Sequence, residues 1–481
     1  MRTEKLYIKG QWKDSAAGDY FDVLNPADGS LVGKMAAAGK EEVLEAIAAA
    51  DQAFEEWSNL PAQVRSGYMK KWHKLLQEKE EIIARTLTAE QGKPLEEALG
   101  EVRSGTSYVE WYAEEAKRVY GETIPASSSP KRIMVLRQPV GVTAAITPWN
   151  FPASMVARKI SPAIAAGCPV ILKPAEKTPF SAVEIIKLAH EAGIPKGVIA
   201  LLAGSAELIG DTLLEDRRVR KITFTGSTDV GKALMKQSAD TVKRVSLELG
   251  GHAPYIVFDD ADLDKAAEEL MGVKIKNCGQ TCVSANRLYV QESVEKELVQ
   301  KLSEAFSKIK IGNGFDKDTQ MGPLIDGDAY RKVQEHVEDA LSKGAKLVTG
   351  GEGFHKGDHD QAGYYYKPTI LVDVTADMKI MKEETFGPVL PIQRFTTEEE
   401  AIQLANNSRY GLASYVFTES LNRGIRVSEK LEFGIVGLND GSPGTAQAPF
   451  GGFKESGLER EGGHFGIESF LEVKYVSISM K

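Results

Sequence analysis

From residue 139 onward the chain alternates short β-rich runs with segments of helical length, and this alternation restricts the possible folds more than any other feature. The runs are VGVTAAI, PVILK, GVIAL, RKITF, RVSLEL and PYIVF. Most of the segments between them are opened by proline or closed by glycine. Such repetition is typical of a mostly parallel, doubly wound sheet, which binds ligands at the carboxyl ends of its strands. The sequence therefore predicts an α/β fold with a dinucleotide-type domain.

The segments on either side of this region have different patterns. Earlier in the chain, the apolar residues of EEVLEAIAAADQAFEEW recur at spacings of three and four, which indicates one face of an amphipathic helix. Further helical patterns cover residues 62–90 and 94–120, and short strands are expected near residues 6–8 and 21–24. After about residue 250 a second series of strands and helices begins, so we expect a separate α/β domain there.

The last residues, SFLEVKYVSISMK, alternate like a β-strand, but no hairpin partner lies next to them in the sequence. A strand of this kind must pair elsewhere. Together with KRIMVLRQ at residues 131–138, it is expected to add to a sheet in another subunit. The sequence therefore predicts a homodimer, with a homotetramer built from two dimers as the alternative.

Charge and cysteine content exclude several kinds of partner. The 59 lysines and arginines are scattered and are outnumbered by 68 aspartates and glutamates, so nucleic acid is not an expected partner. The N-terminal residues MRTEKLYIKGQW lack an apolar core, and no apolar stretch reaches the ~18 residues that a membrane span needs, so no membrane partner is expected. Three cysteines are too few for a disulfide framework, which favours a reducing, cytoplasmic location.

The segment FTGSTDVG at residues 224–231 follows the strand-like run RKITF and precedes a helical pattern. Glycines at such a turn let a pyrophosphate approach the helix N-terminus, where free N–H groups and the helix dipole favour an anion. The spacing is G-x-x-x-x-G rather than G-x-G-x-x-G, so a tight turn without a ligand is an equal alternative. The usual rule of an acidic residue about 20 positions further on would assign Glu248 to a ribose hydroxyl.

Cys282 closes the segment NCGQTC at residues 277–282. A cysteine that follows a glycine turn and enters a helix has N–H groups nearby, and these lower the pKa of its thiol below about 8.5. The thiolate is then a nucleophile for a carbonyl carbon. The alternative is a buried, inert cysteine. The spacing C-x-x-x-C does not suit zinc, and no metal site is expected.

Two further polar residues stand where predicted strands end. Asn150 lies in PWNFP after the run GVTAAI, where its amide N–H can stabilise a developing oxyanion. Glu248 lies between leucines in LELGG, where a desolvated carboxylate suits a general base. A turn asparagine and a paired structural acid are the respective alternatives.

The order of these segments resembles that of the NAD(P)-dependent aldehyde dehydrogenase superfamily. The matching segments are PWNFP at 148–152, KPAEKTP at 173–179, FTGST at 224–228, ELGG at 248–251, GQTC at 279–282, EETFGPV at 383–389 and PFGGFKESG at 449–457. The resemblance covers essentially the whole chain. It implies an aldehyde dehydrogenase-like fold with a Rossmann-type NAD(P)-binding domain at 1–119 and 139–249, an α/β catalytic domain at 250–455, and a small β oligomerisation arm at 120–138 and 456–481.

The resemblance also implies the chemistry. Cys282 is expected to attack an aldehyde, giving a thiohemiacetal and then a thioester, while Asn150 and the backbone N–H of Cys282 hold the oxyanion. Glu248 is expected to activate the water that hydrolyses the thioester, and this role replaces the ribose assignment above. The expected cofactor residues are Trp149, Lys173, Glu176, Gly226, Ser227, Glu384 and Phe386.

Glu176 bears on the choice between NAD and NADP. A carboxylate accepts a hydrogen bond from a ribose 2′-hydroxyl but repels a 2′-phosphate, so NAD is the preferred cofactor and NADP the alternative. Lys177, the next residue, softens this repulsion, so a modest preference is expected.

Within the superfamily the chain looks most like succinate-semialdehyde dehydrogenases, on the segments APYIVFDDADLD, MVARKISPAIAAGCPVILKPA and PFGGFKESGLEREGG. Oxidation of succinate semialdehyde to succinate is therefore predicted. The alternative is a broad-specificity aliphatic, glutarate-semialdehyde or hydroxy-aldehyde dehydrogenase. The expected substrate residues are Arg158, Lys276, Ser442, Thr445 and Phe450.

Two of these residues carry the prediction of an acidic substrate. Arg158 matches an arginine that this subgroup uses for the substrate carboxylate, and a bidentate contact would suit it. A salt bridge on a helix surface is its alternative role. Lys276 stands where the subgroup places a second arginine, and lysine lacks the fork of that side chain.

Some members of the subgroup carry a second cysteine two residues after the nucleophile, and in this chain that residue is Ser284. Cys278 is the only nearby thiol. A regulatory disulfide between Cys278 and Cys282 is left open.

Overall fold

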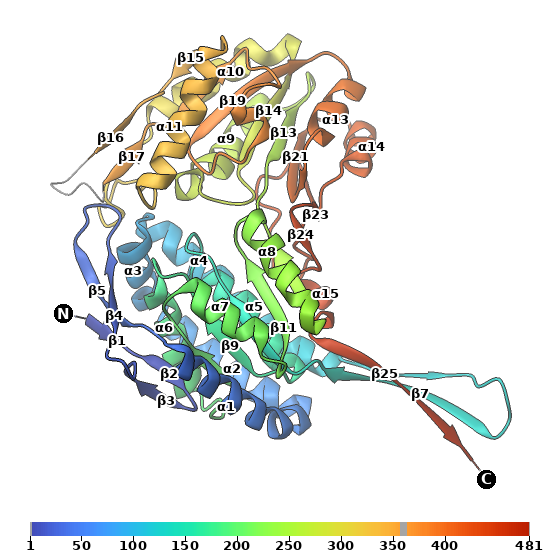
Figure 1. The fold of residues 1–481 in the computed structure, drawn as a ribbon. Helices are drawn as coiled ribbons and strands as arrows, with labels where there is room; N and C mark the ends of the chain where they lie inside the picture. Colours follow the sequence, from blue (N-terminus) through green and yellow to red (C-terminus); the bar gives the residue numbers. More distant parts are fainter. Residues whose placement is uncertain (1, 356–362, 481) are drawn as a thin grey trace.

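A computed structural model describes residues 2–355 and 363–480 (Figure 1). The first half of the chain is organised by an eight-stranded sheet. From one edge to the other its strands are β24 (Gly457–Leu458), β12 (Arg244–Glu248), β11 (Val219–Thr225), β8 (Val142–Ile146), β9 (Val170–Lys173), β10 (Ile199–Leu201), β2 (Leu6–Ile8) and β3 (Gln11–Lys13). The strands from β12 to β10 run parallel, which confirms the doubly wound α/β prediction.

Helices cover both faces of this first sheet. They are α1 (Lys40–Asn59), α2 (Ala62–Glu78), α3 (Glu80–Gln91), α4 (Leu95–Glu115), α5 (Ser154–Ala166), α6 (Pro179–Glu191), α7 (Ala206–Glu215) and α8 (Thr228–Ser238). The chain moves outward through α5 and α6 and returns through α7 and α8, so right-handed crossovers put these two pairs on opposite faces. The helical pattern over 62–90 is interrupted at Lys79 (φ −114°, ψ 15°), which separates α2 from α3.

A second, seven-stranded sheet begins after residue 250, as predicted. Its strands, in spatial order, are β15 (Lys346–Thr349), β18 (Thr369–Val372), β19 (Val389–Phe395), β14 (Ala285–Gln291), β13 (Ala253–Val257), β21 (Ala413–Phe417) and β22 (Ile435–Leu438). The accompanying helices are α9 (Leu263–Ile275), α10 (Glu295–Ser307), α11 (Gly327–Ser342), α12 (Lys379–Lys382), α13 (Glu398–Asn406) and α14 (Leu421–Lys430). This part has its own apolar core, separate from that of the first sheet.

Smaller elements complete the two bodies. A three-stranded sheet near the N-terminus and two short strand pairs consist of β1 (Arg2–Glu4), β5 (Leu31–Ala36), β4 (Tyr20–Leu24), β16 (Gly353–His355), β17 (Tyr364–Tyr366), β20 (Tyr410–Gly411) and β23 (Phe453–Lys454). Among the described residues, none of the helices is long and apolar enough to cross a membrane.

A three-stranded arm projects from the first body (Figure 1). It is formed by β6 (Glu122–Ile124), β7 (Lys131–Pro139) and β25 (Leu471–Ser479). The terminal strand and residues 131–138 lie in one arm, as expected, and β25 pairs antiparallel with β7 of its own chain along its whole length. The preceding helix α15 (Gly463–Glu468) packs on the first body and carries the chain to the base of β7. Only the last part of segment 456–481 therefore belongs to the arm.

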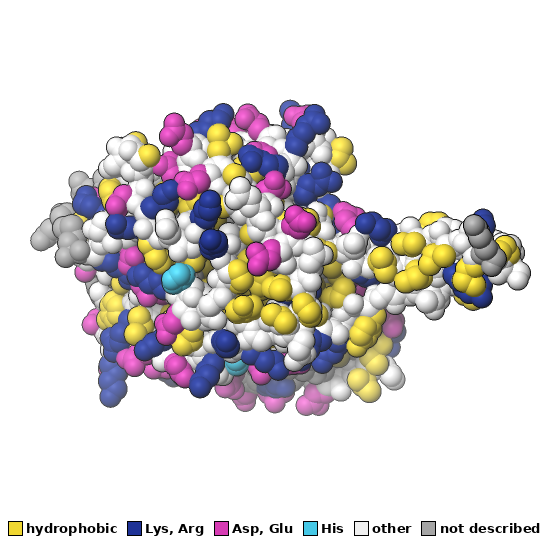
Figure 2. All heavy atoms as spheres, turned by 90° about the horizontal axis from the view of Figure 1, so that it is seen from below, with side chains coloured by type: hydrophobic (Ala, Val, Ile, Leu, Met, Phe, Trp, Pro, Cys, Tyr) yellow, Lys and Arg dark blue, Asp and Glu magenta, His cyan; other side chains and the backbone are white. Residues whose placement is uncertain are grey.

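The arm carries apolar side chains on its surface. Val473 and Tyr475 on β25 are both 61% exposed, and Ile124 and Met134 on the neighbouring strands are exposed as well. Figure 2 shows hydrophobic side chains along the arm and on the adjoining face of the body. The outer edge of β25 has no strand beside it within the described chain.

Candidate active site

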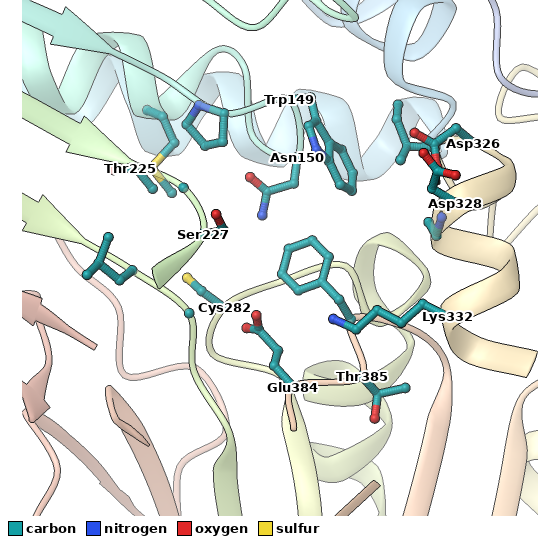
Figure 3. Close-up of a pocket in the computed structure, with 18 residues that line it drawn as sticks. Trp149, Asn150, Thr225, Ser227, Cys282, Asp326, Asp328, Lys332, Glu384 and Thr385 are labelled. Carbon is teal, nitrogen blue, oxygen red and sulfur yellow. Dashed lines mark hydrogen bonds between the residues drawn. The ribbon is translucent and has the colours of Figure 1, made fainter. Parts of the chain in front are cut away.

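A cavity of about 340 Å³ lies between the two bodies, at the carboxyl ends of β8, β11 and β12 (Figure 3). Its lining combines Asn150 and Ser227 from the first body with Cys282, Lys332 and Glu384 from the second. Parallel strands expose free backbone groups at this edge, and a cavity there is the usual ligand site of doubly wound sheets. The structure thus brings together residues that are more than 200 positions apart in the sequence.

Cys282 lies in a turn between the 3-10 helix η3 (Lys276–Gly279) and β14. The prediction that it enters a helix is therefore wrong. The turn is held from within by Gln280, whose buried side-chain oxygen accepts a hydrogen bond from Ile325 N at 2.9 Å. It also approaches the ELGG segment closely, since a Cβ at Gly251 would lie 2.1 Å from the carbonyl oxygen of Cys282. Glycine is therefore required at this position of the ELGG segment.

The thiol of Cys282 is only partly exposed. Burial raises its pKa to about 12, and the nearby carboxyl of Glu384 adds to this effect. The prediction of a lowered pKa is wrong for this geometry, because lost hydration penalises the thiolate more than nearby N–H groups stabilise it. The thiol is therefore protonated at neutral pH, and its attack on a carbonyl requires a group that takes up the proton.

The side chains of Asn150 and Cys282 point into the same part of the cavity (Figure 3). Asn150 Nδ2 donates one hydrogen bond, to Gln280 O at 3.1 Å. A primary amide carries two N–H donors, so the second is available to a ligand in the cavity. A donor of this kind beside a thiol suits the oxyanion of a tetrahedral adduct.

Glu248 is the last residue of β12 and is 4% exposed. Burial, and then the charge of Glu461, raise the pKa of Glu248 well above its ordinary value. Lys159 and Arg158 hold the pKa of Glu461 itself below its ordinary value, although burial acts in the opposite direction. Glu248 Oε2 has no hydrogen-bond partner among the described residues, and the side chain does not line the cavity. Burial of Glu248 therefore favours the protonated form of its carboxyl.

The N-terminus of α8 faces the cavity. Gly226 and Ser227 line the wall, and Ser227 Oγ accepts a hydrogen bond from Val230 N at 3.4 Å, which caps the helix. The glycine is tightly enclosed, because a Cβ at Gly226 would lie 2.3 Å from the ring of Phe224. Free N–H groups at a helix terminus of this kind bind phosphate groups, so the wall fits the pyrophosphate of a dinucleotide.

The remaining predicted cofactor residues lie on both sides of the cavity. The rings of Trp149 and Phe386 line it and meet edge to face, with centroids 5.6 Å apart. Glu384 accepts a hydrogen bond from Gly251 N at 2.9 Å, and burial raises its pKa to about 7. Lys173 and Glu176 lie outside the lining and are paired, with Lys173 Nζ 2.7 Å from Glu176 Oε1.

A second cavity, of about 180 Å³, lies on the other side of the cysteine turn. Thr281 and Val283, which flank Cys282, form part of its wall. Of the predicted substrate residues, the lining includes Arg158, Lys276, Ser442 and Phe450. The structure does not bring Thr445 to this cavity: its side chain is exposed and its hydroxyl donates to Gln447 Oε1 at 2.5 Å.

Arg158 is buried, which excludes the alternative of a helix-surface salt bridge. Its Nη2 lies 3.0 Å from Glu461 Oε2, and its guanidinium carbon lies 4.0 Å from the centre of the Phe450 ring. The alignment with Glu461 is not that of a hydrogen bond, so Nε and Nη2 have no hydrogen-bond partner among the described residues. Buried donors without partners are costly, and a ligand carboxylate in the second cavity would satisfy them.

Four buried residues next to these groups were not predicted: Lys93, Lys159, Asn277 and Glu461. Lys159 Nζ donates to Glu461 Oε1 at 2.7 Å and so links α5 to the C-terminal region. The available signals were weak, namely charged residues inside the apolar pattern MVARKISPAIAA and a lone lysine in QGKP between two helices. The three cysteines are free thiols, and the described residues contain no group of three or more His, Cys, Asp or Glu side chains able to hold a metal ion.

The Cys282 thiol and the N-terminus of α8, whose free N–H groups suit a phosphate, line one cavity, and the sequence matches the Aldehyde dehydrogenase family over residues 12–476. The chain belongs to the aldehyde dehydrogenase family, whose members use NAD or NADP, and it is an oxidoreductase. The predicted family, fold class and enzyme class are confirmed.

Individual relatives cover nearly the whole chain. It is 51% identical to the glutarate-semialdehyde dehydrogenase of Pseudomonas putida, over 99% of this chain and 98% of the relative. It is 50% identical to the succinate-semialdehyde dehydrogenase [NADP(+)] of Escherichia coli, again over 99% and 98%. The crystal structure of succinate-semialdehyde dehydrogenase from Burkholderia pseudomallei has 47% identity and a TM-score of 0.96, covering 99% of this chain and 98% of that chain.

Proposed function

We propose that the protein oxidises succinate semialdehyde to succinate with NAD as the hydride acceptor. The observation that carries this proposal is the second cavity, where Arg158, ion-paired with Glu461 through Nη2, keeps a buried Nε without a hydrogen-bond partner, and Lys276 supplies a second cation behind the cysteine turn. A substrate with an aldehyde at one end and a carboxylate at the other would place the aldehyde at Cys282 and the carboxylate at these cations.

Each step of the proposed reaction uses a described side chain. The Cys282 thiol loses its proton to solvent, its Sγ attacks the aldehyde carbon, and the resulting oxyanion accepts hydrogen bonds from Asn150 Nδ2 and the Cys282 N–H. Gly226 and Ser227 would hold NAD at the helix terminus, and the bound cofactor would supply the acceptor for the hydride that leaves this carbon. Glu248, once deprotonated, takes a proton from the water that hydrolyses the thioester. In total, aldehyde, NAD⁺ and water give carboxylic acid, NADH and one proton.

The rate is expected to rise with pH. Burial raises the pKa values of both Cys282 and Glu248, so the reactive deprotonated forms become more abundant as the pH increases. We expect kcat/KM to increase by up to about tenfold per pH unit on the acidic limb, measured as initial rates of NADH formation. Glu248→Gln should remove the inflection that belongs to Glu248. A rate that falls steadily as the pH is raised above neutrality would contradict this assignment.

Removing either cation of the second cavity tests the substrate. A hydrogen bond to a charged group contributes about 1.5–3 kcal/mol, so Lys276→Ala and Arg158→Ala should each lower kcat/KM for succinate semialdehyde by about 10- to 150-fold. Butanal lacks the carboxylate, so kcat/KM for butanal should fall much less in Lys276→Ala. This variant leaves the Lys159–Glu461 pair intact. Equal losses for both aldehydes, or none for succinate semialdehyde, would overturn the proposed carboxylate recognition.

Glutarate semialdehyde is the second candidate substrate. Lys276 is exposed on a flexible stem, with its ammonium 5.9 Å from the centre of the Phe151 ring, and a point charge of this kind can follow a carboxylate that lies one methylene further away. The Pseudomonas putida relative bears that substrate in its name. Comparing kcat/KM for the two semialdehydes ranks them.

NAD is proposed as the preferred cofactor because of the charge and the exposure of Glu176. Its carboxylate is 41% exposed and would face a 2′-phosphate as a like charge. Lys177 is engaged by Asp326 and is not free to offset this charge. We expect kcat/KM to be about five- to tenfold higher with NAD than with NADP, and Glu176→Ser to narrow the ratio. The Escherichia coli relative carries NADP(+) in its name. A preference of the wild-type enzyme for NADP would overturn the proposal.

We further propose a homodimer, or a homotetramer of two such dimers, assembled through the arm, and a cytoplasmic location. The open edge of β25 and its exposed apolar side chains support self-association of the arm. Three free thiols suit a reducing compartment.

A further inference from the structure

Lys93 is a lysine with no exposed side-chain surface. It contacts the backbone of the loop between β8 and α5, residues 147–153, which is called the Asn150 loop below. Its ammonium donates hydrogen bonds to Glu101 Oε2 at 2.6 Å and to the carbonyl oxygen of Asn150 at 2.8 Å. It also lies 3.9 Å from the centre of the Phe151 ring. Burial of an ammonium carries a large desolvation cost, which only close and well-aligned partners offset. The partner that Lys93 meets at this cost is the backbone of the proposed oxyanion residue.

The same carbonyl oxygen is also bound from the cysteine turn. Asn277 Nδ2 donates to Asn150 O at 2.9 Å, and Asn277 Oδ1 accepts from Gln91 Nε2 at 2.8 Å. The backbone N–H of Asn277 donates to Glu97 Oε2 at 2.8 Å. Asn277 adopts the left-handed region at φ 51°, which is unusual for a residue other than glycine and persists only where its surroundings fix it.

The Asn150 loop is therefore tied at several points. Its carbonyl receives Lys93 and Asn277, and its side-chain amide reaches Gln280 O in the cysteine turn. Downstream, Glu101 Oε1 accepts the backbone N–H groups at the start of α5, from Ala153 at 2.9 Å and Ser154 at 3.2 Å. The Lys93–Glu101 pair thus joins both ends of one loop, and Asn277 joins that loop to the nucleophile.

We propose that Lys93 is a positioning residue, which acts through the backbone of Asn150 and, by sharing that carbonyl with Asn277, sets the separation between the oxyanion amide and Cys282. The inference rests on the proposed function and adds a residue that contacts neither substrate nor cofactor. Displacement of a reacting group by about 1 Å can cost about 100-fold in rate, so loss of this contact should lower kcat with little change in the aldehyde KM.

The experiment compares Lys93→Met in two backgrounds of the full-length enzyme, wild type and Asn150→Ala. The readout is the rate constant of the first turnover of NADH formation, together with KM for the aldehyde and the Kd of NAD. If Lys93 acts through Asn150, Lys93→Met should slow the first turnover by about 10- to 100-fold in the wild type but less than about threefold when the amide is already absent. Raising the NAD concentration should not recover the lost rate constant in either background.

Lys221→Met is the matched control. Lys221 is equally buried, and its ammonium lies 4.8 Å from the Phe470 ring and bonds to Ser246, away from the cavity. This variant should change thermal stability while its first-turnover rate constant stays within about twofold of the wild type.

A folding defect in Lys93→Met would come from the carboxylate that it leaves unpaired. Lys93→Met combined with Glu101→Gln removes both charges, keeps the acceptor for Ala153 and Ser154, and repeats the test. The inference is overturned if the loss is the same in the Asn150→Ala background, or if Lys221→Met slows the first turnover equally. Failure of the proposed function is a separate outcome, visible when Cys282 variants keep their activity.

Discussion

Replacement of Cys282 by alanine is expected to abolish aldehyde-dependent NADH formation, with a loss of at least about 10⁴-fold in kcat. The thiol is the nucleophile of the proposed reaction, and it is the only one of the three cysteines that lines the cavity. The backbone around it should be unchanged, because the turn is held by Gln280 rather than by the cysteine side chain. The variant should therefore still bind NAD, which calorimetry can measure alongside the rate.

Cys168→Ala is the control for the loss of a thiol as such. Cys168 is fully buried in the core of the first sheet, and its Sγ contacts Phe470 O at 3.5 Å. This variant should keep its rate within about twofold while it loses some thermal stability. Retention of more than about one per cent of the wild-type rate by a cleanly purified Cys282→Ala enzyme would mean that the reaction does not pass through a thioester on this residue.

Asn150→Ala should lower kcat by about 10²- to 10³-fold, since one donor to an oxyanion contributes about 2.7–4 kcal/mol in a comparable site. The substitution removes the free N–H that faces the cavity as well as the bond to Gln280 O. The ground-state aldehyde does not need this donor, so KM should change much less than kcat. First-turnover kinetics with saturating NAD measure the affected step directly.

Asn150→Asp distinguishes the loss of the N–H donor from the loss of side-chain volume. The two side chains have nearly the same size, but the carboxylate has no N–H and carries a charge that repels the oxyanion, so its loss should be at least as large as that of alanine. If Asn150→Ala retains more than about a fifth of the wild-type kcat, stabilisation of the oxyanion must be assigned to the backbone N–H of Cys282 alone.

The alternation of strands and helices from residue 139 was enough to predict the first sheet, because local propensity and burial on both faces agree there. Right-handed crossovers over that pattern decide which face of the sheet each connecting helix covers, whereas the order of the strands from β12 to β10 was seen only in the structure. The resemblance placed residues 131–138 and the terminal strand in one arm, but the register of β25 on β7 could not be predicted, since the two strands are more than 300 residues apart and α15 returns the chain to the base of the arm. Non-local pairing of this kind leaves no periodic signal.

Segment order and chemistry identified the thiol, the amide and the carboxyl that meet near the cavity. The same reasoning failed for the charge state of Cys282, because desolvation is a property of the assembled site rather than of the neighbours in the chain. Sequence reasoning also did not identify Lys93, because one of its partners is a carboxylate eight residues away and the other is a carbonyl 57 residues away.

The sequence by itself determined the family, the two α/β bodies and the reactive residue types, since each of these depends on residue identity and order along the chain. The tertiary structure alone decided that Arg158 is buried beside Glu461, that Thr445 faces away from the second cavity and that the Cys282 thiol is protonated. These properties depend on distances and on the exclusion of water between segments that are remote in sequence, and both exist only once the two bodies have packed together.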